Sequence, residues 1–181
     1  GTMDALLPKL GGGRVAREVR DPLGGPVTAA FGLVEDGGTA IVEMASASGL
    51  NLVSDAERDA WAASTYGTGE LIVAAARAGA AVILVAVGGS ATMDGGAGAL
   101  EAIEEAGGLG GTRLVVLSDV RLPWEAAPRV FGPQKGADAA MVKRLERRLD
   151  ELARKLPKDP RGVPMTAAAG ALSGGLWAAH Q

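Results

Sequence analysis

The stretch AAVILVAVGGSATMDGGAGALE, residues 80–101, decides how the rest of the chain is interpreted. Its first half is a continuous apolar run, rich in β-branched side chains, with the length of a buried strand. The run ends at Gly88 and Gly89, and after a short polar loop Gly95 and Gly96 open an amphipathic helical segment. A strand, a glycine-rich turn and a helix N-terminus together form a place where backbone N–H groups can bind an anion. The alternative is a tight turn whose glycines serve close packing.

Composition narrows the classes of protein to which the chain can belong. Of its 181 residues 48% are hydrophobic, which is enough for a sizeable core, and the net charge is −3. The sequence has no basic stripe with interleaved aromatic residues that would predict nucleic-acid binding, and it has no apolar run long enough to predict a membrane span. The absence of cysteine excludes disulfides and thiolate metal sites, and the single histidine, His180, argues against a histidine triad or metal site. We expect a cytoplasmic protein and leave its oligomeric state open.

The segments before the central stretch predict an antiparallel meander. After a helix over residues 2–10, three strand-like runs at 14–20, 26–34 and 39–44 are separated by turn residues, with a hairpin turn at 35–38. Further along, we expect a short amphipathic helix over residues 54–63. A longer helix ends at residue 78, and Thr68 is its candidate cap with Glu70 in its first turn. Another helix starts at Asp138 and carries an apolar face to Leu156.

The central stretch also fixes the direction of two strands. Residues 81–87, 96–106 and 113–117 read as strand, helix and strand, and such a crossover makes the two strands parallel. We therefore predict a mixed-sheet α/β fold, in one domain spanning residues 1–181. Asp94 and Asp119 each follow the carboxyl end of one of the parallel strands, the edge at which open α/β sheets bind ligands.

A second constrained turn, Phe131-Gly132-Pro133-Gln134-Lys135-Gly136, carries one lysine. A lysine in such a frame is a candidate phosphate contact, although a solvated loop lysine is the default interpretation. We expect one cleft at the carboxyl edge of the parallel strands, lined by Ser90, Thr92, Asp94, Asp119 and Lys135.

Five motifs in the same order resemble those of the bacterial glycerate kinases. They are IVEMASASGL at 41–50, STYGTGELI at 64–72, GGSATMDGGAG at 88–98, SDV at 118–120 and FGPQKGA at 131–137. The resemblance spans nearly the whole chain. Three positions depart from the family pattern in a way that bears on the glycine-rich turns: Met93 stands where Asn or Thr is usual, and Ala167 and Ala171 stand where Gly is usual.

The resemblance implies an enzyme that phosphorylates D-glycerate with ATP and Mg²⁺. Phosphoryl transfer relies on positioning and charge stabilisation, and the catalytic candidates are Asp94, Asp119 and Lys135. Which aspartate orients the hydroxyl or holds magnesium through water stays open, and no residue is assigned as a direct metal ligand. The candidates for binding glycerate or the nucleotide are Glu43, Ser46, Ser48, Thr65, Gly67, Thr68, Gly88, Gly89, Ser90, Thr92, Gly95, Gly96 and Gln134. Polar turns and helix caps explain Glu43, Ser46, Ser48 and Thr68 equally well.

Family members are longer, and the resemblance implies that this chain is their inserted domain, similar to restriction-endonuclease-like folds. A flavodoxin-like partner domain is then absent, and Gly1-Thr2 continues a family motif whose first residues are missing. We therefore expect weak anion binding at residues 95–98 without useful turnover. An α/β domain without activity of its own, and an unrelated small-molecule binding domain, remain the alternatives.

Overall fold

The structure is a computed structural model that describes residues 1–34 and 36–181. Within these residues, five strands form one mixed sheet in the order β1-β2-β3-β4-β5. The strands are β1 (Gly12–Arg20), β2 (Pro26–Val34), β3 (Thr39–Glu43), β4 (Val82–Ala86) and β5 (Arg113–Leu117). The helices are α1 (Thr2–Leu10), α2 (Ala45–Ser48), α3 (Tyr66–Arg77), α4 (Ala97–Glu105), α5 (Ala127–Phe131), α6 (Ala139–Ala153) and α7 (Leu172–His180), with 3₁₀ turns at Leu50–Leu52, Asp55–Glu57, Trp124–Ala126 and Pro133–Lys135.

The sheet has the predicted combination of antiparallel and parallel pairs. Strands β1, β2 and β3 form the antiparallel meander, and β4 pairs in parallel with both β3 and β5. The mixed-sheet fold and the strand–helix–strand crossover are therefore confirmed. Of the predicted hairpin turn at 35–38, Glu35 lies outside the described residues, while the amide of Gly37 donates to the carbonyl of Val34 at 2.7 Å.

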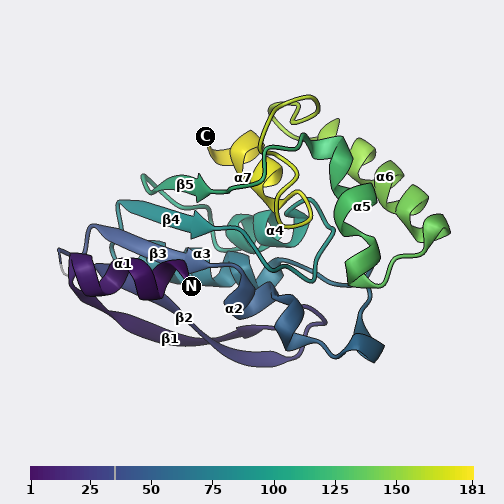
Figure 1. The fold of residues 1–181 in the computed structure, drawn as a ribbon. Coiled ribbons are helices and arrows are strands. Elements are labelled where there is room, and N and C mark those ends of the chain that lie inside the picture. The colour runs from purple at the N-terminus through teal and green to yellow at the C-terminus, as the bar shows by residue number, and fades with distance from the viewer. Residues whose placement is uncertain (35) are drawn as a thin grey trace.

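Helices cover both faces of the sheet, as Figure 1 shows. On one face α1 packs on Ile41 and Leu84 through Met3 and Leu7. On the other face the main core includes Phe31, Val42, Ile83, Val85, Leu71, Ile72, Ile103 and Leu176, which brings α3, α4 and α7 onto the sheet. Ile41 and Val42 face opposite sides because successive strand side chains alternate between the two faces.

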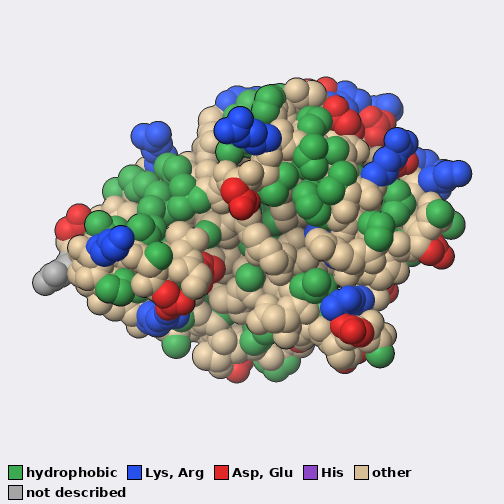
Figure 2. Space-filling view, viewed as in Figure 1, with side chains coloured by type: hydrophobic (Ala, Val, Ile, Leu, Met, Phe, Trp, Pro, Cys, Tyr) green, Lys and Arg blue, Asp and Glu red, His purple; other side chains and the backbone are tan. Residues whose placement is uncertain are grey.

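A second core joins α6 to the loops that follow the strands. Asp138 caps α6 by accepting a hydrogen bond from the Met141 amide at 2.7 Å, as predicted. Leu145 and Leu149 on the apolar face of α6 are buried beside Trp124, Met93 and Ala171. The opposite face is polar, and Lys and Arg side chains gather over α6 in Figure 2.

Two local predictions were wrong. Residues 54–63 contain the 3₁₀ turn Asp55–Glu57 and then a single turn at Asp59, whose carboxylate accepts from the amides of Trp61 and Ala62 and whose carbonyl accepts from the Ala63 amide, but no continuous helix. Helix α3 begins at Tyr66, so Thr65 rather than Thr68 occupies its N-cap position. Thr68 lies inside the helix, where its hydroxyl hydrogen-bonds that of Ser48 at 2.7 Å.

Candidate active site

A cavity of about 800 Å³ lies at the carboxyl ends of the three parallel strands. Among its lining residues, Glu43 is the last residue of β3, Gly88 lies in the loop after β4, and Ser118 and Asp119 directly follow β5. Gly1, Thr2, Ala45 and Met165 also line it. This position is where open α/β sheets bind ligands, because adjacent strand ends and their loops diverge there.

The cavity offers hydrogen-bond acceptors and an open backbone amide. Asp119 is exposed, whereas Glu43 is half-buried and its Oε1 accepts a hydrogen bond from the Met3 amide at 3.0 Å. In the described part of the chain the Gly88 amide has no hydrogen-bond partner, and Gly88 has room for a ligand because a Cβ there would contact nothing within 4 Å. No Lys or Arg side chain is among the described residues that line the cavity. Two carboxylates without a lysine or arginine partner favour a bound cation or hydroxyl groups over a bare phosphate.

Another cavity lies beside it and has an arginine side chain on its wall. It has a volume of about 510 Å³ and shares Ser118, Asp119 and Met165 with the first cavity, and Arg121 is among its lining residues. Sequence reasoning missed Ser118, Arg121 and Met165. Ser118 and Arg121 flank Asp119 in the sequence, so the end of β5 was the available signal; nothing in the sequence pointed to Met165.

Asp94 organises the glycine-rich loop from inside the protein. It is 1% exposed, and its Oδ2 accepts from the Thr65 amide and hydroxyl, both at 2.8 Å, and from the Gly98 amide at 3.2 Å. Its Oδ1 accepts from the Gly96 amide at 3.0 Å. The amides of Gly95, Ala97, Ala99 and Leu100 are bonded to Gly170, Asp94, Thr65 and Gly96, respectively.

The prediction of an anion site at residues 95–98 is therefore wrong. The amides that would bind an anion already have partners within the protein, because the Asp94 carboxylate takes the place of the ligand at the N-terminus of α4. Gly95 and Gly96 are buried, and a Cβ on Gly95 would lie 2.7–2.9 Å from Leu152, Trp124 and Leu149. These glycines serve close packing, which was the alternative interpretation.

Lys135 is buried as well, at 2% exposure. Its Nζ donates to the Ser90 hydroxyl at 2.7 Å and to the Thr92 carbonyl at 2.6 Å. Burial lowers the pKa of Lys135 from 10.5 to about 7, and the negative charge of Asp94 opposes this shift. Lys135 thus ties its own turn to the glycine-rich loop rather than facing solvent, while its neighbour Gln134 is exposed.

The remaining candidates divide between the protein interior and the cavity edge. Ser48, Thr65, Gly67, Thr68, Ser90 and Thr92 are buried. Gly67 allows close contact, because a Cβ there would lie 1.8 Å from the carbonyl oxygen of Arg20. Ser46 donates to the Glu43 carbonyl at 2.7 Å, and Gly89 is exposed beside Gly88.

The prediction of one shared cleft is thus wrong. Ser90, Thr92 and Lys135 form a buried hydrogen-bonded group and Asp94 lies near it, but Asp119 lines an open cavity that includes none of them. Of the predicted set, the cavity contains Glu43, Gly88 and Asp119.

The described residues hold no group of three or more His, Cys, Asp or Glu side chains that could hold a metal ion. None of the helices described is long and apolar enough to cross a membrane.

Comparison with known proteins decides the family. The model of the glycerate kinase family matches residues 1–106 and 104–181. The chain belongs to the glycerate kinase family. It is 36% identical over 213 residues to glycerate 2-kinase of Escherichia coli (strain K12), which covers 98% of this chain and 56% of that protein. It is 39% identical over 184 residues to glycerate kinase of Bacillus subtilis (strain 168), covering 84% and 48%.

The fold agrees with a solved relative. A crystal structure from Salmonella typhimurium LT2, assigned as a glycerate kinase 2, superposes with a TM-score of 0.91 at 36% identity and covers 97% of this chain and 56% of that one. The chain spans about half the length of the curated relatives it matches. The resemblance seen in the five motifs is confirmed, and the comparisons support a domain of the glycerate kinase family over an unrelated binding domain.

Proposed function

We propose that this glycerate kinase family domain forms one side of an active site that transfers the γ-phosphoryl group of ATP to D-glycerate. The observation that carries the proposal is the cavity at the carboxyl ends of β3, β4 and β5, with Glu43, Gly88 and Asp119 on its walls. The relatives named as glycerate kinases supply the reaction class.

The donor groups of the cavity fit Mg²⁺. Magnesium prefers carboxylate and water oxygens and is usually bound through one or two carboxylates together with substrate phosphates. Glu43 and Asp119 are the residues that would hold it, with waters between. When bound, the ion neutralises charge on the transferring phosphates.

The chain's own groups then act by positioning. The free Gly88 amide donates to an oxygen of the bound ligand. The Met3 amide donates to one oxygen of the Glu43 carboxylate and so holds that carboxylate in place at the cavity wall. Asp94 and Lys135 act through the loop: they hold residues 90–98 in place from inside, and this support fixes the position of Gly88 and Gly89.

Within the described residues, the cavity lacks the basic side chains that the proposed reaction needs. Phosphoryl transfer needs positive groups on several sides of the phosphates, and the described lining contains carboxylates and an open amide but no Lys or Arg side chain. We infer that a second domain, flavodoxin-like by the motif resemblance, provides cationic groups across the cavity. The 181-residue chain alone is expected to bind a divalent ion without turning over glycerate.

Paramagnetic broadening with Mn²⁺, a substitute for Mg²⁺, tests the cation site in NMR spectra of the chain. Resonances of Glu43, Gly88 and Asp119 should broaden first, and Asp119→Asn should remove most of the effect. Asp138→Asn is the matched control, because Asp138 is an exposed carboxylate that caps α6 outside the cavity. Broadening that is unchanged by Asp119→Asn would refute the cation site.

An ATP- and glycerate-dependent assay of ADP release tests the second half of the proposal. Turnover by the 181-residue chain near that of a full-length relative would show that the site is complete within these residues. Absence of turnover together with Mn²⁺ binding is the expected result.

A further inference from the structure

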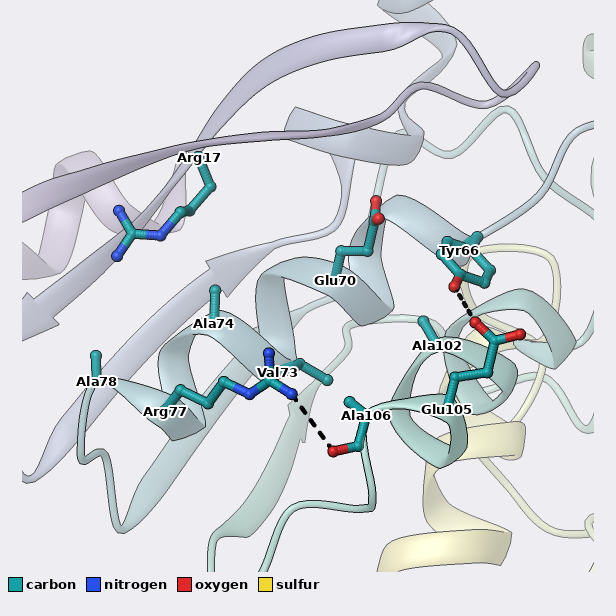
Figure 3. Close-up of a pocket in the computed structure, with 10 residues that line it drawn as sticks. All are labelled: Arg17, Tyr66, Glu70, Val73, Ala74, Arg77, Ala78, Ala102, Glu105 and Ala106. Atoms are coloured by element: carbon teal, nitrogen blue, oxygen red, sulfur yellow. Dashed lines mark hydrogen bonds between the residues drawn. The ribbon is translucent and has the colours of Figure 1, made fainter.

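A second cavity, of about 530 Å³, lies between β1, α3 and α4 (Figure 3). It shares no lining residue with the cavity at the strand ends. Its volume lies within the range of roughly 300–1,000 Å³ found for small-molecule sites. The proposed kinase function does not use it.

Two guanidinium groups in this cavity have no acidic partner. Arg17 extends from β1 and Arg77 from the last turn of α3, and both side chains are exposed. Among the described residues neither forms an ion pair. Arg17 donates to the Ala16 carbonyl at 2.7 Å, and Arg77 makes a long hydrogen bond of 3.4 Å to the Ala106 carbonyl. Most of the donors on each guanidinium therefore remain open.

The two carboxylates of the cavity already have partners. Glu70 accepts from the Arg20 amide at 2.8 Å, and the Arg20 guanidinium lies 4.0 Å from it. Glu105 accepts a hydrogen bond from the Tyr66 hydroxyl, and this bond is the main reason that the pKa of Tyr66 is raised. In Figure 3 Arg17 lies at the end of the cavity opposite Tyr66 and Glu105, while the Arg77 side chain extends towards Ala106 and Glu70 lies between the two ends. Both carboxylates are bonded within the protein, whereas the two guanidinium groups keep open donors.

The floor between the two ends is apolar and shallow. Ala74 and Ala78 of the α3 segment and Ala102 and Ala106 of the α4 segment line it, together with Val73. Such short side chains leave space above the crossing of α3 and α4, and they offer a ligand apolar contact without hydrogen bonds. Tyr66 closes one end and is held in place by the Arg20 guanidinium, 3.9 Å from its ring centroid.

We propose that this cavity binds a small organic anion, with its phosphate or carboxylate group held by the side chains of Arg17 and Arg77, which swing towards it, and its apolar part on the alanine floor. Guanidinium groups bind both oxyanions through pairs of charge-assisted hydrogen bonds. A polar ligand without charge would leave the arginines unused, and a bare anion would leave the floor uncovered. The site is separate from the strand ends, so it can be filled while the proposed catalytic cavity is occupied.

NMR titration of the chain tests the proposal with four probes. Phenyl phosphate and benzoate carry an anion on an aromatic ring, inorganic phosphate is the anion alone, and benzyl alcohol is the ring without charge. Saturable shifts of the amides at residues 73–78 and 102–106 are expected with phenyl phosphate or benzoate, and whichever binds more tightly identifies the preferred oxyanion. Inorganic phosphate and benzyl alcohol should each bind at least tenfold more weakly.

Variants separate a built site from general surface charge. Arg17→Ala and Arg77→Ala should each weaken phenyl phosphate or benzoate binding by about tenfold, because each removes charge-assisted hydrogen bonds. Arg113→Ala is the matched control, since Arg113 is exposed at the start of β5 and lines none of the cavities described above. Ala74→Leu should fill the floor and abolish binding of the aromatic probes while both arginines remain.

Three results would overturn the proposal. One is the absence of saturable shifts at these amides with every probe. Another is equal affinity in the chain, Arg17→Ala and Arg77→Ala. The third is benzyl alcohol binding as tightly as the aromatic anions, which would show that charge plays no part.

Discussion

Replacement of Asp94 by Asn should destabilise the protein far more than the loss of one surface charge does. The buried carboxylate accepts four hydrogen bonds: from the Thr65 amide and hydroxyl, from the Gly98 amide and from the Gly96 amide. An Asn side chain has one acceptor oxygen. If that oxygen replaces Oδ2, the amide of Gly96 faces an NH₂ group and loses its acceptor.

The size of the effect follows from these contacts. One buried amide left without a partner costs about 1–3 kcal/mol, and three bonds that change from charged to neutral lose about 1 kcal/mol each. Part of this loss is recovered because the neutral side chain is cheaper to bury than a carboxylate. We expect a net decrease of about 3 kcal/mol in the free energy of unfolding.

Urea unfolding of the chain, followed by circular dichroism and by the fluorescence of the buried Trp124, measures this decrease. Asp138→Asn makes the same chemical change at an exposed N-cap, where Asn caps as well as Asp, and should cost less than about 1 kcal/mol. A loss for Asp94→Asn no greater than that for Asp138→Asn would show that the Asp94 network contributes little. In that case the Asp94 carboxylate would not be what holds the glycine-rich loop in place.

Three further predictions concern the same loops. The folded-state pKa of Lys135 is about 7 and the unfolded value is 10.5. Between these two pH values only the unfolded chain binds the proton. The free energy of unfolding should therefore rise with pH over this window, by up to about 1.4 kcal/mol per pH unit, and this gain is lost as the pH is lowered to 7. Urea unfolding at pH 7 and pH 9 should show this slope in the native chain and not in Lys135→Met, and parallel profiles would contradict the buried lysine. Gly170→Ala should lower the free energy of unfolding by more than about 3 kcal/mol, because the new Cβ would lie 1.9 Å from the Thr92 carbonyl oxygen. Gly162→Ala is the control: it also has a positive φ but open space around it, and it should cost about 1 kcal/mol. Equal losses of thermal stability in the two variants would show that close packing at Gly170 is not the cause. Thr65→Val should cost about 2 kcal/mol because the Ala99 amide loses its acceptor, and Thr65→Ser should restore most of the loss in the same unfolding assay.

The backbone also explains part of the departures from the family pattern. Ala171 has a φ of 69° at the N-cap of α7, a conformation that favours glycine, so the usual Gly at this position has a conformational reason. Ala167 is not among the residues of positive φ. It is fully buried within the second core, so its methyl group is accommodated by packing. Nothing in the structure explains Met93 in place of Asn or Thr beyond its burial in the same core.

The sequence by itself determined the strands of the sheet and three of its covering helices, α1, α3 and α4. The apolar run at 81–87, the helix after it and the run at 113–117 could only be joined as a right-handed crossover, so parallel pairing followed from local pattern. The three strand-like runs at 14–20, 26–34 and 39–44, separated by turn residues, likewise predicted a meander. Periodicity depends on which side of an element faces the core, and that information is contained in each segment.

Only the tertiary structure decided which polar residues face a ligand. Asp94 and Asp119 each follow a parallel strand, yet Thr65, 29 residues before Asp94, supplies the donors that draw Asp94 inside. Asp119 has no such donor among residues 1–34 and 36–181 and stays exposed. Lys135 is buried because Ser90 and the Thr92 carbonyl, 43–45 residues away, accept its protons. A polar side chain is buried where the fold brings it partners and remains in the cavity where it does not, and those partners come from segments that no local pattern connects.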